Sequence, residues 1–236
     1  MPRTRRHSLP VVALHVIQRG NNRQLCFFNE TDYKFYLKSL FDFATLCEVE
    51  IHAFVLMTNH VHLLVTPAVK HGVSRMMQRL GAKYVANINR LHQRTGTLWE
   101  GRFKSSLVDS HEYCLACYRY IELNPVRAGI VKHPAEYPWT SYRSNTGLEF
   151  SSSISPHPQW LALGQSDRQR FSAYESLVAQ ALSEDKIEQI RYNVSKGLPT
   201  GSRRFKAEVE SALAIKLGDG KRGRPWIKVD KGVRAL

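Results

Sequence analysis

Two histidines separated by a single residue form the first group in this sequence that could bind a metal ion. His60 and His62 flank Val61 within an apolar run. Side chains alternate across a β-strand, so both imidazoles would point to one face and Val61 to the other. Two imidazoles on one face can bind a single divalent cation. Taken alone, the pair is weak evidence for a metal site, because strand histidines also form ordinary surface hydrogen bonds.

A second group lies on one face of a predicted helix further along the chain. Tyr120 and Asn124 are four residues apart, so on an α-helix they lie one turn apart on the same side. Tyr118 lies about 200° around the helix from that side. If this helix packs across the histidine face, Asn124 supplies a third, oxygen ligand and Tyr120 stands beside the cation. The ordinary alternatives are a core tyrosine and a helix C-terminal residue before Pro125.

These residue types together suit an attack on a phosphodiester. A divalent cation polarises the phosphoryl oxygen and neutralises developing charge. A phenol is a weak nucleophile until it is positioned and deprotonated. A phosphotyrosine conserves the energy of the bond, so a 3′-hydroxyl can later reverse the step and join a new strand without ATP. No side chain stands out as the general base, and water or hydroxide near the metal is the default.

The composition favours nucleic acid as the partner. The 34 Lys and Arg residues outnumber the 20 Asp and Glu residues, which gives a formal net charge of +14 at pH 7. A positive charge of this size attracts polyanions at long range. No apolar run reaches the roughly 18 residues of a membrane span, and the basic N-terminus lacks the features of a signal peptide. We therefore expect a cytoplasmic protein that does not bind membranes.

The elements that must position these residues follow the order β-α-β-β-α-β-α. Strands are predicted at 9–18, 50–57, 60–66 and 103–108, and helices at 30–46, at 73–92 and from Asp109 to about Leu123. The intervening Thr58 and Asn59 form a tight connection, so the second and third strands should pair as a hairpin. The βαββαβ order predicts an α+β fold of the ferredoxin-like, split-βαβ type, with packed helices on an antiparallel sheet.

Several separate motifs resemble those of one family, and they occur in that family's order. The run His60-Val61-His62 resembles the histidine–hydrophobe–histidine (HUH) motif of single-tyrosine transposases. Residues 120–131 resemble the catalytic-helix motif of the REP-associated tyrosine transposases, and residues 99–105 and 137–142 resemble two further motifs. The resemblance covers about residues 8–145.

The resemblance implies a fold, a reaction and its ligands. Members of the family carry a ferredoxin-like HUH domain, use Mg²⁺ or Mn²⁺, and form a 5′-phosphotyrosine on hairpin-bearing single-stranded DNA in the bacterial nucleoid. By motif position, Tyr120 is the nucleophile, and His60, His62 and Asn124 are the metal ligands. Many single-tyrosine transposases outside this branch carry the longer glutamine in place of Asn124. A monomer and a homodimer are both compatible with the resemblance.

The candidate DNA-contacting residues are cations and amides with glycine or aromatic neighbours, suited to phosphates, base edges and stacking. They are Arg19, Asn21, Asn22 and Arg23 after the first strand, Arg102 and Lys104 around Phe103, and Arg222 and Arg224 in the tail. The tail resembles an AT-hook, which lies in an A·T-rich minor groove. The alternatives are a polar turn, a core aromatic and a disordered basic tail.

Composition changes near residue 145 and divides the chain into three parts. We expect an HUH domain at 1–145, a linker or long loop at 146–166, and a mainly helical DNA-binding extension with a basic tail at 167–236. The expected function is a metal-dependent single-stranded DNA endonuclease and strand transferase. The alternatives are a rolling-circle or relaxase-type nickase, a non-catalytic DNA-binding regulator and a metallohydrolase.

Overall fold

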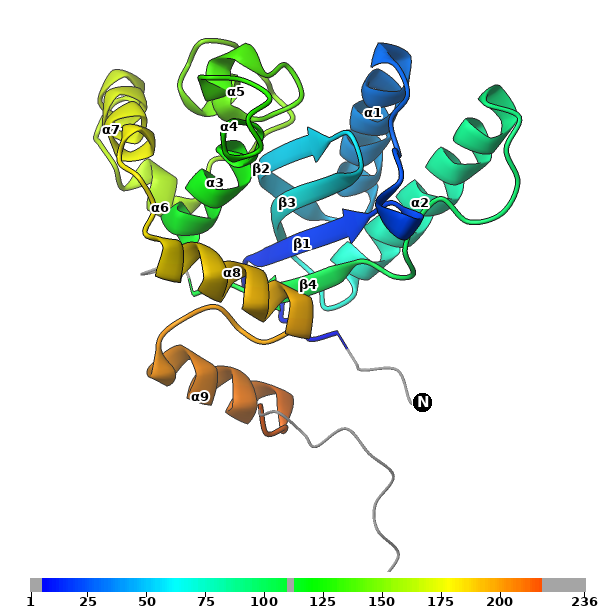
Figure 1. Ribbon diagram of the computed structural model, residues 1–236. Coiled ribbons are helices and arrows are strands. Elements are labelled where there is room, and N and C mark those ends of the chain that lie inside the picture. Colours follow the sequence, from blue (N-terminus) through cyan, green and yellow to red (C-terminus); the bar gives the residue numbers. More distant parts are fainter. Residues whose placement is uncertain (1–5, 110–112, 218–236) are drawn as a thin grey trace, which may run out of the picture.

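A four-stranded antiparallel sheet lies at the centre of the computed structural model, which describes residues 6–109 and 113–217 (Figure 1). Its strands are β1 (Leu14–Arg19), β2 (Val49–Met57), β3 (His60–Pro67) and β4 (Lys104–Leu107). They lie in the order β2-β3-β1-β4, and every neighbouring pair is antiparallel. This is the split-βαβ order, so the predicted α+β, ferredoxin-like fold is confirmed.

Helices α1 (Glu30–Leu46) and α2 (Gly72–Leu91) cover one face of the sheet. A capping box begins α1, because the Asn29 side chain accepts from the backbone of Asp32 and the Asp32 carboxylate accepts from the backbone of Asn29. The apolar stripe of α2 includes Leu80, Tyr84 and Ile88, all at most 1% exposed. These helices bury the sheet face to which Val61 and its alternate neighbours on β3 point.

The opposite face of the sheet carries the two histidines of β3. Helix α3 (Cys114–Glu122) packs on β2 and β3 from this side. Leu64, two residues after His62, lies in the cluster beneath α3, whereas Leu63 lies in the cluster beneath α1 and α2. The predicted alternation along the histidine strand is therefore present. Successive side chains of β3 point to opposite faces of the sheet and are buried in different clusters.

The remaining elements, apart from one short helix near the N-terminus, follow α3 and continue into the expected extension. They are α4 (Asn124–Arg127), η2 (Pro134–Glu136), α5 (Tyr142–Asn145), α6 (Pro158–Leu161), α7 (Asp167–Ala179), α8 (Glu184–Lys196) and α9 (Arg203–Leu213), with η1 (Asn21–Arg23) earlier in the chain. The short helix α6 lies in the segment expected to be a linker, and its Trp160 is 3% exposed. Tyr174 of α7 and Ile190 of α8 share one hydrophobic cluster with Ile121 of α3.

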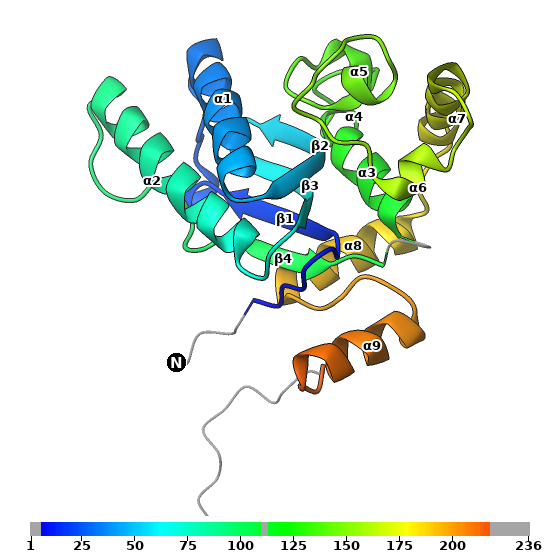
Figure 2. The same ribbon diagram turned by 180° about the vertical axis from the view of Figure 1, so that it is seen from behind.

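Both edges of the sheet are covered by chain that follows α3. Along β2, the backbone of Ser141 donates to Phe54 and that of Ser155 donates to Ile51. Along β4, Thr200 forms a parallel bridge with Val108, and α8 runs beside β4 in both views (Figures 1 and 2). Covered edges do not expose unpaired backbone groups to other chains. The division of the chain into a domain, a linker and an extension, with boundaries near residues 145 and 166, stays a prediction.

One local prediction differs from the structure, and a second one stays untested. The first strand begins at Leu14 rather than Leu9, because the chain turns at Pro10 and Val11, and Val11 has a φ of 54°. Asp109, expected to cap the helix, accepts hydrogen bonds from the backbone N–H and side-chain hydroxyl of Ser202, and its role as a cap stays a prediction. Residues 110–112 lie outside the described residues. Of the helices in the described part, none combines the length and apolarity needed to cross a bilayer.

Candidate active site

The predicted nucleophile and the predicted metal ligands converge from two distant segments. The ring of Tyr120 on α3 lies edge-on to that of His62 on β3, with 5.5 Å between the ring centroids. The rings of His60 and His62 are 5.1 Å apart. By contrast, Tyr118 packs against Tyr174, with 5.9 Å between the rings, as expected for a residue on another side of the helix. The two histidines of β3 and the Tyr120 side of α3 thus meet at one place in the structure.

Hydrogen bonds fix the ring of His60. The Asn59 amide nitrogen donates to the backbone oxygen of Arg23 at 3.0 Å, which turns its Oδ1 toward Nδ1 of His60 at 2.7 Å. Because that oxygen can only accept, Nδ1 of His60 carries the proton and Nε2 keeps its lone pair. No hydrogen bond within the described residues engages that Nε2. Burial and the charge of Arg19 lower the pKa of His60 to about 4, so the ring is neutral near pH 7.

His15 is a third histidine at the site, and sequence reasoning missed it. Its Nε2 lies 2.9 Å from Nδ1 of His62, and its ring is 5.5 Å from that of Tyr120. Burial lowers the pKa of His62 well below 6.5, so this ring is neutral too. A ligand histidine commonly has its second nitrogen held by a neighbouring group. The only sequence signal for His15 was a polar residue within an apolar strand.

Asn124 stands next to the backbone of Tyr120, as their spacing predicted. Its side-chain nitrogen donates to the Tyr120 backbone oxygen at 3.0 Å, which leaves its Oδ1 without a partner among the described residues. No described hydrogen bond or ring contact joins Asn124 to either histidine. The part of the chain that the structure describes contains no cluster of three His, Cys, Asp or Glu side chains suited to a metal. An amide oxygen is therefore the candidate third ligand.

A cationic cavity of about 270 Å³ opens beside Tyr120. Arg19, Arg102 and Lys104 line it, so three of the predicted DNA contacts lie at the site. Glu100 also lines it, and its carboxylate accepts from Nε of Arg19 at 2.8 Å. The cations that line the cavity outnumber this single carboxylate, so the cavity suits an anion.

The loop after β1 folds tightly against the turn that precedes the histidine strand. A Cβ on Gly20 would lie 2.2 Å from the backbone oxygen of Gln24, so a larger residue does not fit there. Asn21, Asn22 and Arg23 form η1, and Arg23 holds Asn59 through its backbone. The predicted contacts Arg222 and Arg224 lie outside the described residues.

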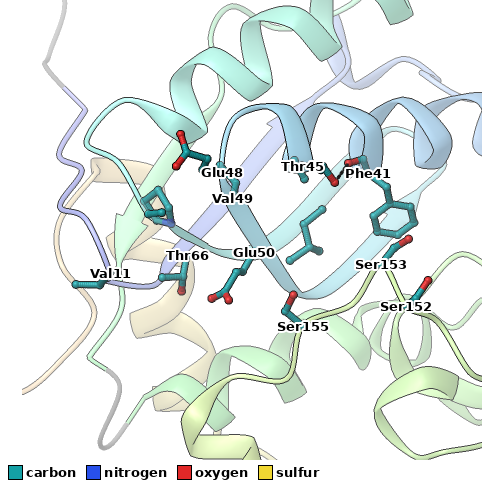
Figure 3. Close-up of a pocket in the computed structure, with 14 residues that line it drawn as sticks. Val11, Phe41, Thr45, Glu48, Val49, Glu50, Thr66, Ser152, Ser153 and Ser155 are labelled. Carbon is teal, nitrogen blue, oxygen red and sulfur yellow. Dashed lines mark hydrogen bonds between the residues drawn. The ribbon is translucent and has the colours of Figure 1, made fainter.

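A larger cavity, of about 620 Å³, lies at the far end of β2 and β3 and contains none of the predicted site residues (Figure 3). Glu48 and Glu50 line it together with Ser152, Ser153 and Ser155. Carboxylates repel phosphates, so this cavity is a poor site for DNA despite its size.

Arg127 also holds Tyr120 in place. Its guanidinium lies 4.6 Å from the centroid of the Tyr120 ring and donates to the Tyr120 backbone oxygen. Burial lowers the pKa of Arg127 to about 10, so it keeps its charge at neutral pH. A cation over the ring face restricts the rotation of the phenol and adds positive charge where a phosphate would arrive.

A fully buried carboxylate supports the same helix. Glu122 is 0% exposed and accepts hydrogen bonds from Asn145 at 2.7 Å, from Tyr174 at 2.6 Å and from Ser141. The three donors belong to segments that follow α3, so this group ties the helix to α5 and α7. Desolvation raises the pKa of Glu122 from its ordinary 4.5 to about 7, against the opposing effect of these hydrogen bonds.

Replacing Glu122 with glutamine should flatten part of the pH dependence of stability. In the wild type, the unfolded carboxyl ionises from about pH 4.5 upward while the folded one stays protonated until about pH 7, so stability falls as pH rises through that window. Glutamine cannot ionise. The free energy of unfolding of the wild type relative to Glu122→Gln should therefore fall by about 2 kcal/mol between pH 5 and pH 8. Urea unfolding measures both curves, and parallel curves would contradict this assignment.

Comparison with known proteins relates this geometry to a family. The pattern of IS200-like transposases matches residues 8–124, a segment that holds Tyr120, His60, His62 and Asn124. The solved structure of a REP-associated tyrosine transposase bound to a REP hairpin has the same fold, with a TM-score of 0.54 and 17% identity, over 67% of this chain and 93% of that chain. A Deinococcus radiodurans protein described as a candidate transposase gives a TM-score of 0.37 and 21% identity, over 49% of this chain and 91% of that chain. No curated protein matches the sequence.

Proposed function

The chain belongs, through residues 8–124, to the IS200-like transposase family, and on that premise we propose that it is a metal-dependent single-stranded DNA endonuclease and strand transferase that acts through a phosphotyrosine on Tyr120. The observation that carries this proposal is the packing of the Tyr120 ring against His62, 5.5 Å between centroids, at the wall of a cationic cavity. A non-catalytic binder has no need of this arrangement.

The residues at the site fit a divalent cation, Mg²⁺ or Mn²⁺. His60 and His62 each use Nδ1 in a hydrogen bond and keep Nε2 as the nitrogen that can bind metal, and Asn124 offers a free amide oxygen. Neutral imidazoles and amide oxygens are suitable ligands for such ions. When bound, the ion would polarise the phosphoryl oxygen and offset the charge that develops in the reaction.

The protein's own groups account for the rest of the reaction. Cationic side chains, among them Lys104 and Arg127, attract the phosphodiester and hold it beside the phenol. The Tyr120 oxygen attacks phosphorus and gives up its proton to water, the P–O bond to the 3′ oxygen breaks, and that oxygen takes up a proton. The product is a 5′-phosphotyrosine and a free 3′-hydroxyl. Attack by the 3′-hydroxyl of another strand reverses these steps and joins the two strands.

We further propose that the substrate is single-stranded DNA with a hairpin, processed in the bacterial nucleoid by a monomer or a homodimer. The structurally similar REP-associated transposase holds a REP hairpin. In this chain, the loop with Asn21, Asn22 and Arg23 adjoins the cavity through Arg19, so it can contact bases or phosphates next to the reacting one. The experiment is incubation of the protein and Mn²⁺ with end-labelled single strands from the flanks of its own gene. Cleavage with a protein-linked 5′ product supports the proposal, and cleavage with two free ends indicates a hydrolase instead.

Removal of the tail should affect duplex binding and leave cleavage intact. Arg222 and Arg224 lie outside the described residues, and their Arg-Gly-Arg-Pro sequence suits an A·T-rich minor groove. Truncation before Lys221 should weaken binding to an A·T-rich duplex about tenfold, with little change in the cleavage of short oligonucleotides. Fluorescence anisotropy at one fixed salt concentration measures the affinity. Equal affinities of the two proteins for the duplex would reject a role for the tail.

A further inference from the structure

Helix α8 lies outside the segment that matches the family, yet it forms one side of the Tyr120 site. It contacts β4, β1 and α3, and both views show it running beside the sheet (Figures 1 and 2). Ile187, Ile190 and Val194 anchor it, each at most 3% exposed. Their spacing of three and four residues makes one apolar stripe, which fixes how α8 rotates about its axis.

Two further contacts hold the extension against the catalytic helix itself. The guanidinium of Arg119 donates to the backbone oxygen of Gln180, in the turn between α7 and α8. The hydroxyl of Tyr174 on α7 donates to Glu122 at 2.6 Å. Because Arg119 and Glu122 flank Tyr120 on α3, the position of α8 is set from the helix that carries the nucleophile.

This packing brings one cation of the extension to the site. Arg191 follows the anchor Ile190 and lines the same cavity as Tyr120 and Lys104. No ion pair or hydrogen bond holds the Arg191 side chain among the described residues, and the cavity's Glu100 is already engaged with Arg19.

The cations gathered around the Tyr120 ring repel one another until an anion arrives. Arg191 and Lys104 line the cavity beside Tyr120, and the guanidinium of Arg127 lies over the Tyr120 ring, so three positive charges lie near the phenol. A guanidinium can hold a phosphate through two parallel hydrogen bonds. We propose that Arg191 binds a backbone phosphate of the DNA strand held at Tyr120, so that the C-terminal extension completes the active site. This inference rests on the proposed function, because it takes the cavity's ligand to be DNA.

Binding without metal tests the inference separately from catalysis. The protein carries Tyr120→Phe to prevent cleavage, and single-stranded hairpin oligonucleotides each carry one neutral methylphosphonate, moved stepwise along the strand. The variants are Arg191→Ala and Arg191→Lys. The matched control is Arg168→Ala, the same change at an exposed residue of α7. Thermal unfolding checks that every variant is folded.

At one phosphate position, the protein with Arg191 should lose about tenfold in affinity when that phosphate is made neutral. Arg191→Ala should bind the unmodified strand about tenfold more weakly and be insensitive to the change at that position alone. Arg191→Lys should retain part of the sensitivity, and Arg168→Ala should behave like the protein with Arg191. Wild-type affinity of Arg191→Ala would overturn the inference. So would a loss of affinity from Arg191→Ala that is additive with the loss from the methylphosphonate at every position of the strand. This experiment measures binding and not cleavage, so its failure leaves the proposed function standing. The proposed function fails if the wild-type protein forms no phosphotyrosine in the separate incubation with Mn²⁺.

Discussion

Phenylalanine in place of Tyr120 should reduce single-strand cleavage by about 10⁴-fold or more and abolish the covalent protein–DNA adduct. The change removes only the phenolic oxygen. The ring keeps its contacts with His15, His62 and Arg127. Hairpin binding in the absence of metal should therefore change by less than about twofold, since no packing is lost. A denaturing gel follows the adduct, and anisotropy follows the binding.

Tyr118→Phe is the matched control for this substitution. Tyr118 lies two residues earlier on α3, is fully buried, and accepts a hydrogen bond from the backbone of His157 at 3.3 Å. Its removal should cost about 1 kcal/mol of stability and leave the adduct in place. An adduct that persists in Tyr120→Phe and disappears in Tyr118→Phe would mean that the nucleophile is misassigned.

Loss of either strand histidine should remove the response to divalent metal. His60→Ala and His62→Ala should each lower Mn²⁺-dependent cleavage by about 10³-fold, because a site left with one imidazole and one amide oxygen holds the ion weakly. Cleavage rates over a Mn²⁺ titration measure the effect, and calorimetric titration with Mn²⁺ measures binding directly. The second readout separates weaker metal binding from a distorted active site.

His52→Ala controls for the removal of a buried strand imidazole. His52 lies on β2, is 0% exposed, and bonds to Ser155 and Thr66 without touching Tyr120. Its loss should destabilise the fold by a few kcal/mol, comparable to the loss of His62, and leave Mn²⁺ affinity unchanged. Unchanged metal dependence in both His60→Ala and His62→Ala would take these residues out of a metal site.

Features encoded by neighbouring residues were predictable from the sequence. The helix expected at 30–46 matches α1 (Glu30–Leu46), whose capping box and apolar spacing are both local. The hairpin of β2 and β3 followed from one tight connection, and it brought the predicted histidine pair to one face. The i, i+4 relation correctly placed Asn124 beside the backbone of Tyr120.

Features that depend on strand order and distant packing were not predictable. His15 reaches His62 only because β1 pairs with β3, so that Ile17 lies opposite His62 and His15 lies opposite Leu64 on the same face. Glu122 finds its donors 19 to 52 residues later in the chain. Arg191 reaches the cavity through the packing of α8, which no local pattern near Tyr120 indicates. The carboxylate of Asp109 binds Ser202, which is 93 residues away.

The identity of the residue bound to DNA is the most direct test of the account. Trapped adduct from a single-stranded hairpin substrate and Mn²⁺ can be digested with protease and sequenced by mass spectrometry. The account predicts one modified peptide, spanning α3, with the nucleotide on the oxygen of Tyr120. A nucleotide on any other side chain, or a cleaved strand that never becomes attached to protein, would contradict it.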